Sequence, residues 1–264
     1  SPMRARRFTM PGLPPPPSIT VIGCGRFGRF LTEQLAPIVG AAVWDADPTR
    51  LGDLPAGARP VSWDEACAGE VLVLAVPIRA LPALLDRLGK QVRPRSLVID
   101  TASVKVWPMR WMRASLPGTV QILGTHPLFG PDSAPRGLDG QRLVLVPERV
   151  RYPHLVRRTL ESLGLRCVET TAEGHDREIA ETQALTHWIG RALERCGARP
   201  RDVDTLGYRR LLEILRYVEN DSWELFEDLE RWNPYARPVR QRFLEALAHL
   251  DDEIGDSDRG DSDR

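Results

Sequence analysis

The chain has 264 residues, of which 42% are hydrophobic, and its 36 basic side chains balance 36 acidic ones. A chain of this length buries roughly 70–75% of its unfolded surface, so its core needs neither disulfides nor structural metal. Zero net charge removes the broad cationic field that non-specific nucleic-acid binding requires. The four cysteines form no C-x-x-C pair, and no apolar run reaches the roughly 18 residues of a membrane span. These features predict a cytoplasmic protein without a metal site.

Short apolar runs alternate with helical stretches over residues 18–170. Residues 1–17, with four consecutive prolines, predict a flexible arm, and a repeated Gly-Asp-Ser-Asp-Arg predicts a disordered tail over 255–264. The expected strands are 19–22, 42–44, 71–76, 97–99, 120–123 and 143–146. Because these runs are continuously apolar, they indicate strands buried on both faces of a parallel sheet. Residues 18–170 are therefore predicted to form an α/β, Rossmann-like dinucleotide-binding domain.

A glycine-rich turn follows the first expected strand and opens a helical stretch. It consists of Gly23, Cys24, Gly25, Arg26, Phe27 and Gly28, which have the form G-x-G-x-x-G. The first glycine permits the tight turn, the second lets the backbone approach a pyrophosphate, and the third lets the helix pack closely on the strand. A glycine turn without a ligand is the alternative, but the strand–turn–helix context favours a nicotinamide dinucleotide.

An acidic residue selects between the two nicotinamide dinucleotides. Asp45 ends the second expected strand, about 20 residues after the turn, where a carboxylate binds the ribose hydroxyls of NAD. The same carboxylate repels the 2′-phosphate of NADP. Arg50 lies too far along the chain to serve as a phosphate clamp. The cofactor expected is therefore NAD rather than NADP.

Two polar segments follow later strands, where ligands gather in open α/β sheets. Residues 100–105 read Asp-Thr-Ala-Ser-Val-Lys, and residues 124–133 contain a histidine next to a proline. A neutral imidazole at His126 can accept a hydroxyl proton, since the ordinary histidine pKa of about 6.5 suits a base at neutral pH. Ser103 can hydrogen-bond the same hydroxyl. From residue types alone, a structural role for this loop histidine is an equal alternative.

From about residue 171 the strand-type runs stop and helical periodicity continues to residue 254. Thr170 and Glu173 have the spacing of a capping box that opens the first helix. The further helices expected are 208–219, 222–231 and 234–254. An all-α domain of about 80 residues often completes its core by pairing with another subunit. Residues 171–254 are thus predicted to be an all-α C-terminal dimerisation domain of a homodimer.

The first helix of this domain carries a polar stripe. On a helical wheel Asp176, Gln183 and His187 lie within about 40° of one another. The opposite face gathers Leu185, Trp188, Ile189, Ala192 and Cys196. By periodicity alone the polar stripe is a solvated face and the apolar face packs on the core.

In this order the motifs resemble those of the prephenate and arogenate dehydrogenases of tyrosine biosynthesis. The resemblance covers most of residues 18–250. It rests on the glycine turn, Val76-Pro77, the D-x-x-S-x-K that ends at Lys105, the H-P-L-F-G-P-D-S that begins at His126, and residues 175–187. It implies oxidative decarboxylation of prephenate to 4-hydroxyphenylpyruvate, in which ring C4 gives hydride to NAD and C1 loses its carboxylate as CO₂. His126 resembles the catalytic histidine, Ser103 the serine beside it, and Val76 and Pro77 belong to the cofactor site.

The resemblance also implies a substrate site, in which the polar stripe faces a cleft. The residues it suggests are His187, Gln183, Thr125, Asp132, Arg216 and Tyr208. The fused-type enzymes bind a substrate carboxylate through an arginine where this chain has Tyr217. Arg216, one residue earlier and therefore turned by about 100°, is the candidate replacement. Arogenate dehydrogenase, which makes tyrosine directly, remains the alternative function.

Two other functions fit parts of the pattern. The β-hydroxyacid dehydrogenases share the layout but use a lysine in the second domain, whereas both lysines here, Lys90 and Lys105, precede residue 106. A non-catalytic NAD(H)-binding redox sensor needs neither His126 nor Ser103. The short arm leaves no room for the additional domain of fused relatives. We expect a monofunctional enzyme that acts on a small molecule and has no nucleic-acid or membrane partner.

Overall fold

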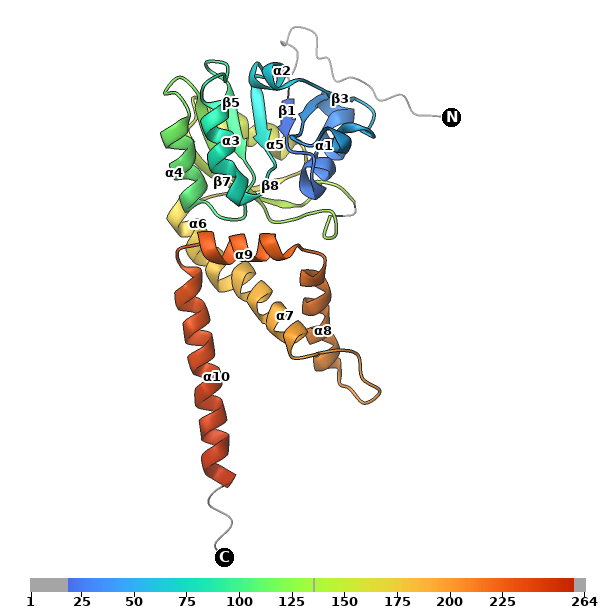
Figure 1. Cartoon of the computed structure of the whole chain (residues 1–264), viewed down its shortest axis with the longest axis vertical. Coiled ribbons are helices and arrows are strands. Elements are labelled where there is room, and N and C mark those ends of the chain that lie inside the picture. Colours follow the sequence, from blue (N-terminus) through green and yellow to red (C-terminus); the bar gives the residue numbers. More distant parts are fainter. Residues whose placement is uncertain (1–18, 135, 259–264) are drawn as a thin grey trace, which may run out of the picture. The chain divides into compact units, whose positions relative to one another are not determined.

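The computed structural model describes residues 19–134 and 136–258 (Figure 1). The arm expected over 1–17 and the end of the expected tail, 259–264, lie outside the described residues. The chain divides into two compact units, with the division between His175 and Asp176.

The first unit is built on one eight-stranded sheet with the order β3-β2-β1-β4-β5-β6-β7-β8. Its strands are β1 (Ile19–Ile22), β2 (Ala41–Trp44), β3 (Ala58–Pro60), β4 (Val71–Leu74), β5 (Leu97–Asp100), β6 (Gln121–Pro127), β7 (Arg142–Arg149) and β8 (Arg166–Glu169). The order of the first six strands, 3-2-1-4-5-6, is that of dinucleotide-binding sheets. The predicted Rossmann-like fold class is confirmed.

The expectation of a fully parallel sheet is wrong at one place. Strands β6 and β7 pair antiparallel, whereas the other neighbouring pairs are parallel. A parallel pair needs a crossover, usually a helix, and the described residues of the connection 128–141 form turns instead. The edge strands β3 and β8 were not expected. Each is three or four residues long and mostly exposed, so neither has the apolar run that identified the other strands.

Among the described residues of this unit, five α-helices and two 3₁₀ turns accompany the sheet. They are α1 (Arg26–Val39), η1 (Pro48–Leu51), α2 (Trp63–Cys67), η2 (Ile78–Ala80), α3 (Leu81–Leu88), α4 (Val106–Ser115) and α5 (Pro153–Ser162). The central strands are buried on both faces, as their continuous apolar runs predict. Side chains with at most 1% exposure include Val21, Ile22, Leu72, Leu74, Val98 and Ile122.

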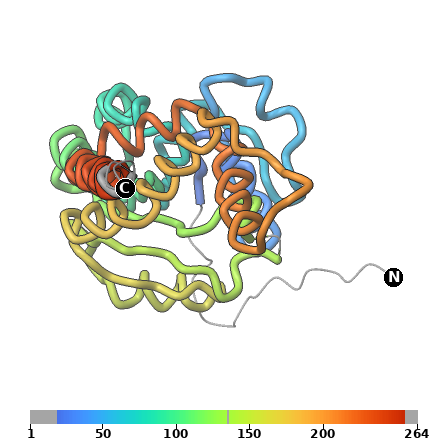
Figure 2. The backbone as a smooth tube through the Cα atoms, turned by 90° about the horizontal axis from the view of Figure 1, so that it is seen from below, coloured from blue at the N-terminus to red at the C-terminus, as the bar shows by residue number. Residues whose placement is uncertain are grey.

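The described residues of the second unit form helices joined by turns and loops, and no strand occurs among them. After α6 (Ala172–Ile179), which spans the division, come a π-helical turn η3 (Ala180–Ala184), α7 (Leu185–Arg195), α8 (Leu206–Glu219), α9 (Trp223–Trp232) and α10 (Ala236–Asp258). Figure 2 looks nearly along α10, drawn in red, which continues to Asp258, past the expected end at residue 254. No helix in the described part of the chain combines the length and apolar character that crossing a membrane requires.

The helix cap expected at Thr170 is wrong by one residue. The Thr170 N–H donates to the Leu145 carbonyl and so still extends the pairing of β7 with β8. Thr171 caps α6 instead, because its Oγ1 accepts the N–H of Gly174 at 3.0 Å. A cap side chain reaches the second or third helical residue, so Glu173 cannot close a capping box with Thr170.

Candidate functional site

The glycine-rich turn connects β1 to α1, and two of its glycines are required by packing. Gly23 has φ +102°, and a Cβ there would lie 2.3 Å from the carbonyl oxygen of Ala75 and 2.9 Å from Val76 Cγ1. A Cβ on Gly28 would lie 1.9 Å from the carbonyl oxygen of Gly23. These contacts hold the turn against the end of β4, where Pro77 then opens η2. The predicted roles of the first and third glycines thus match the geometry.

The middle glycine faces open space. A Cβ on Gly25 would meet only Arg50 Nη1, at 3.7 Å. Gly25 is also the N-cap of α1, whose first-turn amides have no acceptor within the helix. Space beside such amides is what a pyrophosphate requires. Phe27 differs from the rest of the motif, since its ring packs on Phe30 at 6.1 Å between centroids and contributes to the core.

Asp45 lies beside this turn with an arginine next to it. Its Oδ2 accepts the N–H of Cys24 at 2.6 Å, and its Oδ1 accepts the N–H of Asp47 at 2.8 Å. Although Arg50 was not expected to act as a phosphate clamp, η1 folds the chain back and brings its Nη1 within 3.8 Å of Asp45 Oδ2. A carboxylate and a guanidinium therefore flank the position expected for the cofactor ribose.

An ion pair joins the two motif regions of the first unit. Arg26, the first residue of α1, pairs with Asp132 in the connection between β6 and β7. Both side chains are about half exposed, at 46% and 48%. The structure thus brings the glycine turn together with Asp132, one of the residues expected in the substrate site.

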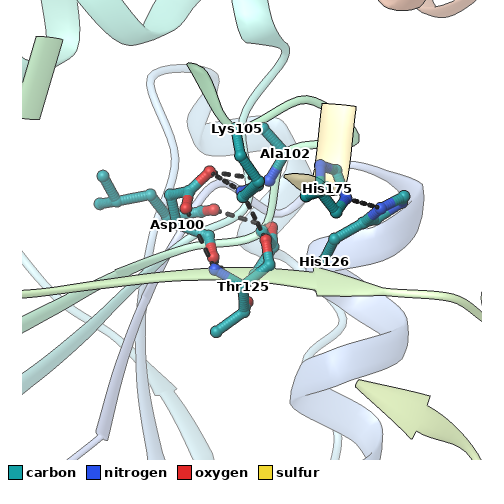
Figure 3. A network of polar contacts seen from close by, with 8 residues as sticks. Asp100, Ala102, Lys105, Thr125, His126 and His175 are labelled. Carbon is teal, nitrogen blue, oxygen red and sulfur yellow. Dashed lines mark hydrogen bonds and ion pairs between the residues drawn. The ribbon is translucent and has the colours of Figure 1, made fainter. Parts of the chain in front are cut away.

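A fully buried lysine holds the ends of β5 and β6 together (Figure 3). Lys105 Nζ donates to Asp100 Oδ2 and to the Thr125 carbonyl, both at 2.5 Å. Asp100 Oδ1 accepts the N–H of Thr125 at 3.2 Å, and Oδ2 accepts the N–H of Ala102 at 3.1 Å. Burial raises the pKa of Asp100, and the lysine and these donors act against that rise. Half-buried Ser103 lies on the bend that this network closes.

His126 lies on β6 itself and not on a loop, and only 3% of it is exposed. Its Nδ1 lies 2.8 Å from Nε2 of His175, which is also 3% exposed (Figure 3). Burial, then His175 and then Lys105, lowers the pKa of His126 well below its ordinary value of 6.5. The imidazole is therefore uncharged at neutral pH, and it stays uncharged to a lower pH than the ordinary histidine pKa used in the sequence analysis implies. His175 was missed as a site residue, because a His-Asp dipeptide has no spacing rule of its own.

The solvated stripe that periodicity alone predicts in the second unit is wrong, because two of its three polar residues are buried and the third, Gln183, is partly buried. Asp176 and His187 are 0% and 1% exposed, while Ala192 and Cys196 on the expected core face are exposed. The π-helical turn η3 interrupts the continuous α-helix that the wheel assumed, which changes the angles after it.

Contacts with α8 and its C-terminal end cover His187. Its Nε2 lies 3.6 Å from Asp221 Oδ2, and its ring meets Tyr217 at 6.2 Å between centroids and an angle of 76°. Burial lowers the pKa of His187, and Asp221 acts in the opposite direction. His187 Nδ1 and Gln183 Oε1 are buried without a hydrogen-bond partner among the described residues. The hydrogen-bonding capacity of both atoms is thus unsatisfied within the described structure.

The remaining two expected substrate residues have other surroundings. Arg216 is exposed on α8. The Tyr208 hydroxyl donates to the Arg199 carbonyl at 2.9 Å and so closes the connection between α7 and α8. A buried arginine, Arg191, lies one helical turn after His187 and donates through Nη2 to the Asp221 carbonyl at 2.5 Å. The spacing i, i+4, i+8 from Gln183 could have identified it.

Residues 56–168 match the family model of the prephenate dehydrogenase nucleotide-binding domain, and residues 192–263 match a TYRAAT1-like C-terminal domain. Arogenate dehydrogenases 1 and 2 of Arabidopsis thaliana, both chloroplastic, are 29% and 30% identical over 88% of this chain. The chain spans 38% and 66% of their respective lengths.

Two further matches cover most of both proteins. A 4-amino-4-deoxyprephenate dehydrogenase of Streptomyces pristinaespiralis is 29% identical over 92% of this chain and 85% of its own length. The crystal structure of prephenate dehydrogenase from A. aeolicus, in complex with hydroxyphenyl propionate and NAD+, has a TM-score of 0.73. It covers 94% of each chain at 18% identity, which establishes a common fold.

Proposed function

Because this chain belongs to the prephenate/arogenate dehydrogenase family, we propose that it is an NAD-dependent dehydrogenase of a small cyclohexadienyl acid. The first substrate proposed is prephenate, which the enzyme converts to 4-hydroxyphenylpyruvate in tyrosine biosynthesis. The observation that carries the proposal is His126, a buried imidazole kept neutral at the end of a central strand. A neutral imidazole there is a base that needs no prior deprotonation at neutral pH.

The proposed reaction assigns one proton transfer to His126 and one hydrogen bond to Ser103. Bound NAD+ supplies the hydride acceptor for ring C4. His126 Nε2 takes the proton of the C4 hydroxyl as hydride leaves the same carbon, and Ser103 binds the hydroxyl oxygen. The C1 carboxylate then departs as CO₂, and its electron pair completes the aromatic ring. The phenolate oxygen regains the proton from His126, so the base ends as it began.

The residues of the glycine turn fit the proposed cofactor. The open space at Gly25 lies beside the first turn of α1, which favours a pyrophosphate there. Asp45 would accept hydrogen bonds from the ribose hydroxyls, which favours NAD. Arg50, 3.8 Å from that carboxylate, offsets part of its repulsion of a 2′-phosphate. NAD is therefore proposed as the preferred cofactor, with measurable use of NADP.

The choice of substrate has two alternatives, each with its own support. Arogenate is favoured by the two Arabidopsis relatives and by Tyr217 at the position of the fused-type arginine. An amine-bearing analogue is favoured by the Streptomyces relative, of which the chain covers 85%. With a C4 amine in place of the hydroxyl, the base would take its proton from nitrogen.

The test measures formation of the reduced cofactor by its absorbance. The substrates are prephenate, arogenate and 4-amino-4-deoxyprephenate, and each is assayed with NAD+ and with NADP+. The proposal expects turnover of at least one acid and a higher kcat/KM with NAD+. Absence of turnover on all three acids would refute it. Tight NAD(H) binding without any turnover would instead support a redox sensor.

We also propose that the protein is a homodimer that pairs through α10. The helix exposes an apolar stripe at spacings of three and four residues, formed by Leu244, Leu247, Leu250 and Ile254 with exposures of 51%, 49%, 56% and 68%. A second copy would cover this stripe. Analytical ultracentrifugation should show a dimer that Leu247→Glu weakens more than tenfold and that His249→Glu, on the opposite side of α10, leaves intact. A monomeric wild type would contradict this.

A further inference from the structure

We propose that His175 is a positioning residue that keeps the proton of neutral His126 on Nδ1 and so leaves Nε2 as the base. This inference rests on the proposed function. Its geometric basis is the 2.8 Å separation between His126 Nδ1 and His175 Nε2. The two rings lie 5.0 Å apart between centroids at an angle of 75°. Only 3% of each residue is exposed to solvent.

Two neutral rings at this distance share one proton between the facing nitrogens. Either His126 Nδ1–H donates to His175 Nε2, or His175 Nε2–H donates to His126 Nδ1. In the second arrangement the proton of neutral His126 sits on its Nε2, which then cannot accept another. Only the first arrangement leaves His126 able to take a proton from a substrate hydroxyl.

The protonated state of His126 also favours the first arrangement. After His126 accepts a proton, both of its ring nitrogens carry hydrogen, and Nδ1–H needs an acceptor in a buried site. His175 Nε2 is that acceptor when its own proton is on Nδ1. A carboxylate in this place would favour the charged imidazolium more strongly. A neutral imidazole orients His126 without a full charge, and Lys105 is a cation that opposes protonation further.

The chain anchors both histidines to the same strand, β7. His126 pairs with Val144 in the β6–β7 ladder, and Thr125 pairs with Leu145. The Leu145 carbonyl accepts the N–H of Thr170, and Thr171 then caps α6. The His175 N–H donates to the Thr171 carbonyl at 2.9 Å. These backbone hydrogen bonds hold His175 in the first turn of α6, close to the part of the β6–β7 ladder that contains His126.

The direct test is the tautomer of His126 in the full chain without substrate. Nitrogen-15 NMR of labelled protein, with the His126 signals assigned by their loss in His126→Asn, should show Nδ1 protonated and Nε2 bare in wild type. His175→Leu should shift this population toward Nε2–H, whereas His175→Gln, whose Oε1 can accept from Nδ1–H, should retain it. Wild type with the proton on Nε2, or His175→Leu with an unchanged tautomer, would overturn the proposal.

Kinetics provide the second test. We expect His175→Leu to lower kcat by about 10–100-fold with KM changed less than about twofold, by analogy with the loss of a partner that orients a metal-bound histidine. His175→Gln should recover most of that loss. The matched control is His154→Leu on α5, an exposed histidine, which should leave kcat unchanged. If His175→Leu does not fold, wild type and His175→Gln decide the question.

The two proposals fail separately. Absence of turnover on every cyclohexadienyl acid would remove the proposed function and leave the tautomer measurement intact. Equal kcat in wild type and folded His175→Leu, in an active enzyme, would remove only the role of His175.

Discussion

Lys105→Met should destabilise the protein strongly, because it leaves a buried carboxylate without its cation. Both Lys105 and Asp100 are 0% exposed, and Lys105 Nζ also satisfies the Thr125 carbonyl. Removal of one partner of a buried ion pair costs about 3–5 kcal/mol. With a urea slope of about 3 kcal/mol per M, the unfolding midpoint should fall by about 1–1.7 M. Lys90→Met, the same change at the other, exposed lysine, should not shift the midpoint.

The pH dependence of this loss has a definite sign. Without Lys105 the folded-state pKa of Asp100, already raised by burial, rises further above its unfolded value. A carboxyl whose folded pKa is raised loses stability as pH increases through that pKa. The destabilisation by Lys105→Met should therefore be smaller at pH 5 than at pH 8.

A second substitution isolates the charge as the cause. Asp100→Asn in the Lys105→Met background removes the buried charge while its Oδ1 can still accept the N–H of Thr125, and it should recover part of the lost midpoint. The assay is urea denaturation of all four proteins, followed by circular dichroism, at both pH values. A midpoint loss below about 0.3 M in Lys105→Met, or no recovery in the double variant, would refute the reasoning.

Three further outcomes concern the site. His126→Asn should lower kcat by about 10²–10⁴-fold and leave NAD affinity unchanged in a fluorescence titration. Because the base is buried and neutral, wild-type turnover should rise with pH only below the ordinary histidine pKa of 6.5 and stay level to pH 8. A rise in turnover centred at or above pH 6.5 would contradict this. Gly25→Val should fold with wild-type Tm yet bind NAD at least about tenfold more weakly, whereas Gly23→Val should lower Tm. Arg50→Ala should weaken NADP binding by about tenfold, or 1.4 kcal/mol, relative to NAD, and equal weakening of both would contradict its proposed effect.

Local signals in the sequence were sufficient for much of the first unit. The apolar run Ile19–Ile22, the glycine turn and Asp45 identified β1, the start of α1 and the end of β2, because each depends on neighbours in the chain. The direction of β7 could not be read this way, since its run of apolar residues is the same for either direction. The pairing of β7 depends on the connection 128–141, whose described residues form no helix, and not on its own residues.

The sequence also could not predict contacts between side chains that depend on how the chain turns between them. Arg50 is five residues from Asp45, but η1 determines that its guanidinium returns to the glycine turn. The contact between His126 and His175 spans 49 residues and requires the antiparallel ladder together with the cap at Thr171. Each of these contacts depends on a local element that the sequence did not predict: η1 in the first case, and the antiparallel ladder with the Thr171 cap in the second.

The prediction from periodicity that the polar stripe of the second unit is solvated failed for a different reason, and this reason bears on function. Periodicity assigns polar residues to solvent because an unsatisfied buried polar group costs about 1–3 kcal/mol. Gln183 Oε1, His187 Nδ1 and Arg191 Nε are nevertheless buried without hydrogen-bond partners among the described residues. Together they offer an acceptor, a donor and a nitrogen that can be either. A polar ligand that satisfies them would recover part of this cost on binding. Hence we expect Gln183→Leu to weaken substrate binding, seen as a raised KM, while it raises Tm.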